Sequence, residues 1–169
     1  MAAARPLRAD PIAQARANWT AAGWGDVADG MAAVTSVMRI QQLLLTRVES
    51  VLRAHELTFA RFEVLMLLLF SARGQLPVGK IGERLQVHPA SATNAVQRLE
   101  VAGLVERWAN PDDARSWIVA PTARGREVAL RAADALNAEV FADVGLSPED
   151  QRQVLDVFTR WRHAYRDFE

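Results

Sequence analysis

Residues 78–125 have the sequence VGKIGERLQVHPASATNAVQRLEVAGLVERWANPDDARSWIVAPTARG, and this stretch decides the fold. Its first half predicts two short helices joined by a tight turn at Gln86 and Val87. Its second half predicts a two-stranded hairpin, because strand-forming runs flank the turn residues from Asn110 to Asp113. Two such helices followed by a hairpin are typical of a winged helix-turn-helix, which places one helix in the major groove of DNA.

The second helix of this unit, over residues 88–103, carries the side chains expected to read DNA. Pro89 suits a first helical position and Gly103 a C-terminal stop. Short polar side chains near its start let the helix approach base edges closely, and Asn or Gln can bond adenine in two places. Ordinary solvated positions are the alternative interpretation, but a place inside a helix-turn-helix favours DNA contact. The residues predicted to contact DNA are His88, Ala90, Ser91, Thr93, Asn94, Gln97 and Arg98.

In the hairpin, Arg115 lies two residues after Asp113, near the tip. An arginine at this place can enter a narrow minor groove, where negative potential is concentrated. The alternative is a local surface ion pair, which contributes about 0 to 1 kcal/mol. We predict that Arg115 and Ser116 contact DNA. Asp113 is expected to brace the wing, by holding the turn or by orienting the Arg115 guanidinium.

The regions on either side of this unit predict further helices and a dimer. Along residues 31–52, apolar side chains recur at spacings of three and four with a second apolar row beside them. This helix must therefore be buried against its own domain and against a partner. The last helix, which opens at Ser147, has a wide apolar stripe as well.

The predicted fold is mainly α with a small β-hairpin wing, in a single compact domain. Its winged helix-turn-helix spans 58–120, and dimerisation helices at 31–57 and 121–169 flank that unit. An N-terminal extension at 1–30 contains a short helix and a flexible link marked by Gly23, Gly25 and Gly30.

The composition excludes several classes of function. The 169 residues contain no cysteine, which excludes disulfides, thiolate zinc sites and thiol redox chemistry. The three histidines lie far apart without paired carboxylates, and there is no glycine-rich phosphate loop, so we expect no enzyme, no metal site and no cofactor. The N-terminus lacks the apolar core of a signal peptide, and the longest apolar run, residues 64–70, is too short to span a bilayer. A cytoplasmic protein without membrane contact is expected.

Charge indicates a nucleic-acid partner only weakly. The net charge is zero, and residues 78–126 contain seven basic and five acidic side chains, a net +2. A two-fold symmetric dimer would double this excess on one face. The neutral total and the acidic wing, with Asp112 beside Asp113, leave an alternative: a winged-helix module that binds a protein partner and no specific DNA.

Four motifs follow one another in the chain: Arg98-Leu99-Glu100, Gly103-Leu104-Val105-Glu106-Arg107, Asp113-x-Arg115-Ser116 and Thr122-x-x-Gly125. In this order and at these spacings they resemble the winged helix-turn-helix of the MarR family of transcriptional regulators. The resemblance extends over nearly the whole chain, because helices flanking a central winged unit are also the family's layout. It implies a homodimeric repressor on double-stranded DNA with a roughly palindromic operator, released or retained on binding a small, often aromatic and anionic, effector. His88 departs from the family, which often has serine at this cap position.

An extra N-terminal helix with a tryptophan resembles the members of the family that respond to urate. Those members also use an acid on the second helix, and arginines in the recognition helix and on the first wing strand. The resemblance implies that Trp19, Glu63 and Arg107 bind an effector, while Ala95 replaces the remaining arginine and argues against urate itself. The alternative is that Trp19 and Trp24 only pack the extra helix onto the dimer.

Overall fold

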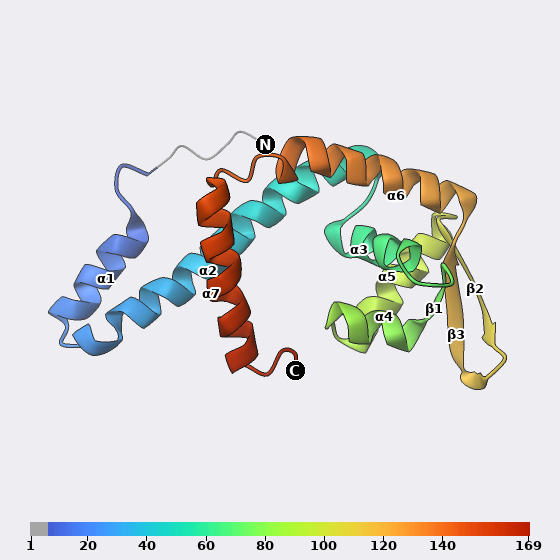
Figure 1. The fold of residues 1–169 in the computed structure, drawn as a ribbon, viewed down its shortest axis with the longest axis horizontal. Helices are drawn as coiled ribbons and strands as arrows, with labels where there is room; N and C mark the ends of the chain where they lie inside the picture. Colours follow the sequence, from blue (N-terminus) through green and yellow to red (C-terminus); the bar gives the residue numbers. More distant parts are fainter. Residues whose placement is uncertain (1–6) are drawn as a thin grey trace. The chain divides into compact units, whose positions relative to one another are not determined.

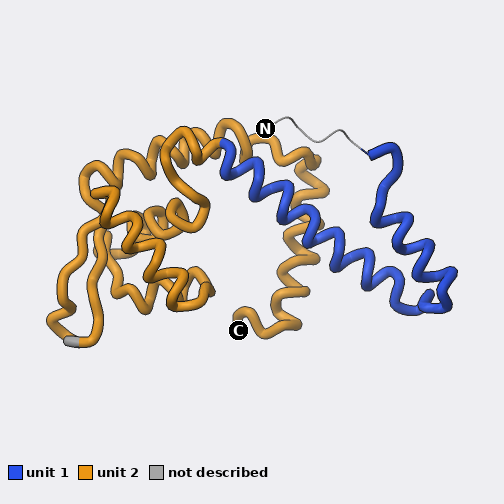
Figure 2. Tube along the Cα trace, turned by 180° about the vertical axis from the view of Figure 1, so that it is seen from behind, with its two compact units in different colours: residues 1–50 blue, residues 51–169 orange. Residues whose placement is uncertain are grey.

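The computed structural model describes residues 7–169, apart from the side chain of Ala114 (Figure 1). Residues 1–6 of the predicted N-terminal extension lie outside the described residues. Contacts divide the chain into two compact units, residues 1–50 and 51–169 (Figure 2), whereas the sequence suggested a single compact domain. The division falls near the end of the long helix α2 (Gly25–Leu52), because the side chains of residues 37–47 are all exposed and form no core.

The first unit consists of helix α1 (Pro11–Ala21) and most of α2. Asp10 caps α1, since its Oδ1 accepts a hydrogen bond of 2.9 Å from the backbone N–H of Ile12. The flexible link expected through Gly30 was wrong, because α2 already begins at Gly25. A single glycine costs a helix only about 1 kcal/mol, and Asp26 lies in the first turn, where the helix dipole favours an acid.

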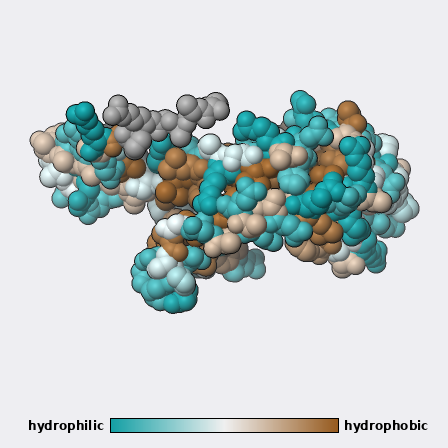
Figure 3. Space-filling model, turned by 90° about the horizontal axis from the view of Figure 1, so that it is seen from above, coloured by the Kyte–Doolittle hydropathy of each residue, from teal (hydrophilic) through white to brown (hydrophobic). Residues whose placement is uncertain are grey.

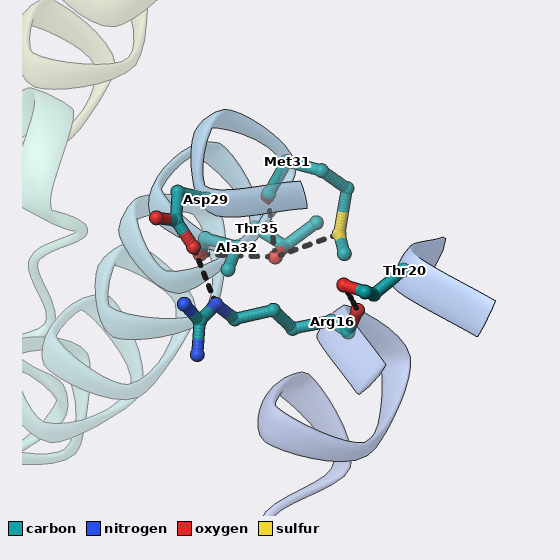
Figure 4. A network of polar contacts seen from close by, with 6 residues as sticks. All are labelled: Arg16, Thr20, Asp29, Met31, Ala32 and Thr35. Atoms are coloured by element: carbon teal, nitrogen blue, oxygen red, sulfur yellow. Dashed lines mark hydrogen bonds and ion pairs between the residues drawn. The ribbon is translucent and has the colours of Figure 1, made fainter. Parts of the chain in front are cut away.

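Polar and aromatic contacts hold α1 against the start of α2. The Arg16 guanidinium forms an ion pair with Asp29 across the two helices (Figure 4). The rings of Trp19 and Trp24 meet edge to face, with their centroids 5.3 Å apart. The Thr35 hydroxyl donates a hydrogen bond of 2.9 Å to the backbone carbonyl of Met31, so it is satisfied within α2 itself.

The second unit is a bundle of short helices with a small sheet. A 3-10 turn at Arg53–His55 follows α2. Thr58 then caps α3 (Phe59–Leu69), because its Oγ1 accepts a hydrogen bond of 3.4 Å from the N–H of Arg61. The helix-turn-helix consists of α4 (Val78–Leu85) and α5 (Pro89–Val101). The turn between them begins at Gln86, whose backbone lies in the left-handed region with a φ of 52°. Leu65, Leu68, Ile81 and Leu99 are fully buried and form the core of the helix-turn-helix.

The sheet has three antiparallel strands in the order β1-β3-β2. The strands β2 (Val105–Asn110) and β3 (Asp113–Pro121) form the wing, which Figure 1 shows extending beyond the helices of this unit. Trp108 pairs with Ile118 in the register. The sequence did not predict β1 (Leu76–Pro77), because two residues that include a proline give no strand pattern, and β1 exists only through its pairing with β3. Pairing with β2 extends β3 over its full length, from Val105 opposite Pro121 to Asn110 opposite Asp113.

Helix α6 (Ala123–Leu136) is fixed to the end of α5 by a close backbone contact. The Thr122 hydroxyl donates to the carbonyl of Gly103 at 2.8 Å and accepts from the N–H of Gly125 at 3.0 Å. A Cβ built on Gly125 would lie 1.8 Å from the carbonyl oxygen of Leu104, so this approach requires glycine. The wing base, the end of α5 and the start of α6 therefore form one tightly packed corner.

The chain continues through a π-helical turn (Asn137–Phe141) to α7 (Pro148–Ala164). The Ser147 Oγ caps α7 by accepting from the N–H of Asp150 at 3.1 Å. No residue of α7 is buried within the chain, and apolar side chains such as Leu155 and Val157 are exposed on it. Apolar side chains (brown) are visible at the molecular surface in Figure 3.

Candidate nucleic-acid interface

The packing of α5 separates its buried side from the side predicted to read DNA. Ala92, Val96 and Leu99 are buried at 2%, 1% and 0% exposure and fix the helix on the core. These positions follow a spacing of three and four, so the intervening polar positions face outward. Ser91, Asn94, Gln97 and Arg98 are all exposed, and they share the outer face of the helix.

The first turn of α5 is capped by His88. Its Nδ1 accepts a hydrogen bond of 3.2 Å from the N–H of Ala90. Because Nδ1 is the acceptor, the other ring nitrogen, Nε2, is left as the donor toward solvent. Ala90 is exposed, whereas Thr93 is half-buried and its hydroxyl already donates to the carbonyl of Pro89 at 2.9 Å.

The tip of the wing is held by two acceptor side chains. Asp113 Oδ1 accepts from the backbone N–H of Arg115 at 3.0 Å, and Asn110 Oδ1 accepts from the N–H of Asp112 at 3.1 Å. Asp113 thus braces the turn of the backbone and does not pair with the guanidinium. Arg115 is exposed and Ser116 half-buried. Within residues 7–169, no ion pair engages the Arg115 side chain.

The predicted effector residue Arg107 lies on strand β2 of the wing and contacts Glu100 in the last turn of α5. Its Nε is 2.9 Å from Glu100 Oε2, and its guanidinium lies over the Trp117 ring, 5.0 Å from the ring centroid. The two charged side chains are only 28% and 35% exposed. Sequence reasoning missed the contacts of Glu100 and Trp117 with Arg107, because they depend on the hairpin folding back beside the helix.

A groove of about 420 Å³ lies between α4, α5, β2 and β3. Thr93, Arg107, Arg115 and Trp117 are among its lining residues, so two arginines and an indole ring border one space. The predicted effector residue Glu63 is half-buried on α3 and does not line this groove. Burial raises the pKa of the Glu63 carboxyl above its ordinary value. Trp19 belongs to the first unit, where it contacts Trp24.

Basic side chains around the interface differ in how they are engaged. Lys80 on α4 is paired with Glu83 at 2.6 Å. In the part of the chain that the structure describes, Arg84, Arg98 and Arg115 form no ion pair, so their charges are available to a phosphate backbone. Arg98 lies on the outer face of α5, and Arg115 lies near the tip of the wing.

Comparison with known proteins assigns the family. The family model for MarR regulators matches residues 57–117. Sco5413 from Streptomyces coelicolor, a MarR family transcriptional regulator, is 43% identical; the match covers 83% of this chain and 98% of that one, with a TM-score of 0.77. The chain belongs to the MarR family. The resemblance predicted from the four motifs is confirmed, as is the mainly helical fold with its small antiparallel sheet.

Two further MarR relatives extend this comparison. The transcriptional regulator TtmR of Methylorubrum extorquens strain PA1 is 34% identical over 107 residues, which are 63% of this chain; the chain spans about half (53%) of that regulator's length. Sco3205 of Streptomyces coelicolor, a MarR family regulator solved in complex with DNA, shares the fold with a TM-score of 0.70 at 24% identity, covering 84% of this chain and 89% of that one.

This MarR family member is a transcriptional regulator and not an enzyme. None of the helices within residues 7–169 is long and apolar enough to cross a membrane.

Proposed function

We propose that this MarR regulator binds operator DNA as a homodimer and represses transcription. The recognition helix α5 enters the major groove, and Arg115 of the wing enters the adjoining minor groove. The observation that carries the proposal is the outer face of α5, where Ser91, Asn94, Gln97 and Arg98 are exposed together beside an unpaired wing arginine. Short polar side chains on such a face fit base edges, and the arginines fit phosphates or a narrow minor groove.

Hydrogen-bond donors at the start of α5 support this orientation. The Nε2–H of His88, freed because Nδ1 caps the helix, is a donor to a phosphate oxygen. Exposed Ser91 adds a hydroxyl in the first turn, where the helix dipole attracts anions. We assign Ala90, Thr93 and Ser116 to close backbone contact with DNA, because their side chains are small or already engaged.

The exposed apolar side chains of α2 support a dimer. Val37, Ile40, Leu44 and Leu45 are between 37% and 49% exposed, although they are large aliphatic residues. Contiguous apolar surface of this kind marks a protein interface. Helix α7 likewise contributes apolar side chains without a buried position. We assign both helices to the two-fold contact that presents two copies of α5 to one DNA duplex.

The groove between α5 and the wing fits a small aromatic anion, which would relieve repression. Arg115 supplies positive charge and Trp117 supplies an aromatic surface within one space of about 420 Å³, which Asp113 and the Glu100-paired Arg107 also line. A ligand seated there would compete with DNA for Arg115. Trp19 and Glu63 remain proposed effector residues, although neither of them lines this groove.

The experiment that tests DNA binding is a titration against the promoter beside the protein's own gene, repeated at several salt concentrations. Released counterions make affinity fall steeply with salt, by roughly 10³-fold or more between 50 and 200 mM for an interface with six or more phosphate contacts. An unrelated duplex of equal length is the control for specificity. Binding that does not weaken with salt would contradict the proposal and favour the alternative, a module that binds a protein partner.

A further inference from the structure

One ion pair connects the recognition helix to the wing. Within residues 7–169, Glu100 and Arg107 form the only side-chain ion pair between α5 and the strands β2 and β3. Glu100 belongs to the last turn of α5, and Arg107 belongs to the first half of β2. The orientation of the wing relative to the helix therefore depends on this contact and on the packing at the wing base.

The geometry of this contact is specific for arginine. Arg107 Nε approaches both carboxylate oxygens of Glu100, at 2.9 and 3.1 Å, while the face of the guanidinium lies over Trp117. A planar guanidinium can form hydrogen bonds at its edge and stack through its face, which an ammonium group cannot do. Both charged side chains are about two-thirds buried, so water screens the pair less than it screens an exposed one.

The three side chains hold both strands of the wing to the helix. Arg107 pairs with Val119 in the sheet register and Trp117 with Ala109, so the contact lies across the middle of the hairpin. The tip begins three residues beyond Arg107, about 10 Å further at 3.3 Å per residue. A rotation of about 20° at Arg107 would therefore displace the wing tip by about 3 Å relative to α5.

We propose that Glu100 is a positioning residue: through Arg107 and Trp117 it fixes the angle of the wing. This brace (Glu100, Arg107 and Trp117) lets Arg115 reach the minor groove while α5 occupies the major groove. Preorganisation of this kind increases affinity because the wing loses less conformational freedom on binding. The inference rests on the proposed DNA-binding function, and it adds a residue that itself touches no DNA.

A double-mutant cycle on operator affinity tests the brace. Arg115→Ala is measured in the wild-type background and in the Glu100→Ala background, with the whole 169-residue chain and the same duplex. We expect Arg115→Ala to weaken binding about 30-fold in the wild type and no more than about 3-fold beside Glu100→Ala. Loss of the Glu100 charge raises the attraction to DNA equally in Glu100→Ala and in the Glu100→Ala, Arg115→Ala double variant. This effect therefore cancels when the affinities of these two proteins are compared. An equal loss in both backgrounds overturns the inference.

Glu106→Ala is the matched control, because it removes an exposed acid from the same strand without touching Arg107. In that background Arg115→Ala should still cost about 30-fold. A second pair of variants covers the case in which Glu100→Ala does not fold. In the Trp117→Leu background, the loss of affinity caused by Arg115→Ala should be reduced, as it is in the Glu100→Ala background. In the Trp117→Phe background, which keeps an aromatic face, this loss should be as large as in the wild type. If both Trp117 variants leave the effect unchanged, the brace has no positioning role.

A second readout separates positioning from simple stability. The wild type should prefer operators with A·T-rich flanks, whose narrow minor groove attracts arginine. The Glu100→Ala variant should lose this preference at a temperature where its circular dichroism is that of the folded protein. Retained preference contradicts the inference alone. Failure of the wild type to bind any duplex overturns the inference together with the proposed function.

Discussion

At the scale of single residues, Arg115 is expected to contribute most to affinity for DNA in general. It is exposed, lies near the wing tip and has no ion-pair partner among the described residues. We expect Arg115→Ala to weaken binding to many sequences by about 2 kcal/mol, or about 30-fold, because a minor-groove arginine responds to potential and hardly to base identity. Fluorescence anisotropy with several duplexes measures this effect. Arg131→Ala, on α6 and paired with Glu127, is the control. Unchanged affinity of the Arg115 variant would exclude the wing from DNA binding.

Asn94 is expected to determine specificity instead of overall affinity. It is exposed on the outer face of α5, and an asparagine amide can bond adenine in two places. Asn94→Ala should relax the preference at one base position of each half-site, with a loss of about 1 to 3 kcal/mol for the preferred base. Binding-site selection from a random library measures this directly. An identical selected sequence for both proteins would show that Asn94 reads no base.

Gly125 is a residue whose role is purely steric. Because a Cβ at this position would lie 1.8 Å from the Leu104 carbonyl, Gly125→Ala should lower the free energy of unfolding by about 3 kcal/mol or more. Gly30→Ala is the matched control: its Cβ meets nothing within 4 Å, so it should raise stability by about 0.5 to 1 kcal/mol. Urea unfolding measures both. Equal effects for the two variants would contradict the tight corner at Leu104.

Residues whose contacts are local were predictable from the sequence, and those with distant contacts were not. The caps at Asp10, Thr58 and Thr122 are local in this sense, because each side chain accepts a hydrogen bond from a backbone N–H only two or three residues further along the chain. The pairing of Glu100 with Arg107 spans a helix end, a left-handed glycine at Gly103 and a strand start. No periodicity encodes such a contact, because it depends on the angle at which the wing leaves the helix.

At the scale of secondary-structure elements, helices with strong periodicity or a proline at their first position were predicted within a few residues. The strand β1 was missed because its stability comes from pairing with β3, and α2 began earlier than expected because Gly30 does not interrupt a helix rich in alanine. The groove between α5 and the wing had no sequence signal, since four elements (α4, α5, β2 and β3) create it.

Helix α2 is predicted to form the dimer interface, which sedimentation in solution can test. Leu44 is 41% exposed on its apolar row, so a charge there should be tolerated in a monomer and disfavoured in a dimer interface. We expect the wild type to sediment as a dimer at micromolar concentration and Leu44→Glu as a folded monomer. Phe70→Glu, at a position 80% exposed on the winged unit, is the control and should remain dimeric. A monomeric wild type would contradict the assignment of α2 to the dimer.

At the scale of the whole molecule, the proposed function requires two copies of α5 acting together. A single winged unit with a local charge excess of only +2 offers modest attraction to DNA, and two-fold repetition doubles it on one face. The order of motifs predicted the family and the winged unit. The dimer was predicted only from apolar rows, because an interface between copies leaves no other mark on the sequence of one chain.

Hydroxyl-radical footprinting of the purified protein, on the promoter fragment that it binds, can show whether a two-fold symmetric dimer contacts the duplex. Two α5 helices of a symmetric dimer should enter successive major grooves on one side of the duplex. We therefore expect two protected segments related by two-fold symmetry, with half-site centres about 10 to 10.5 base pairs apart. A single protected half-site, or protected segments without a two-fold relation, would contradict the proposed symmetric dimer.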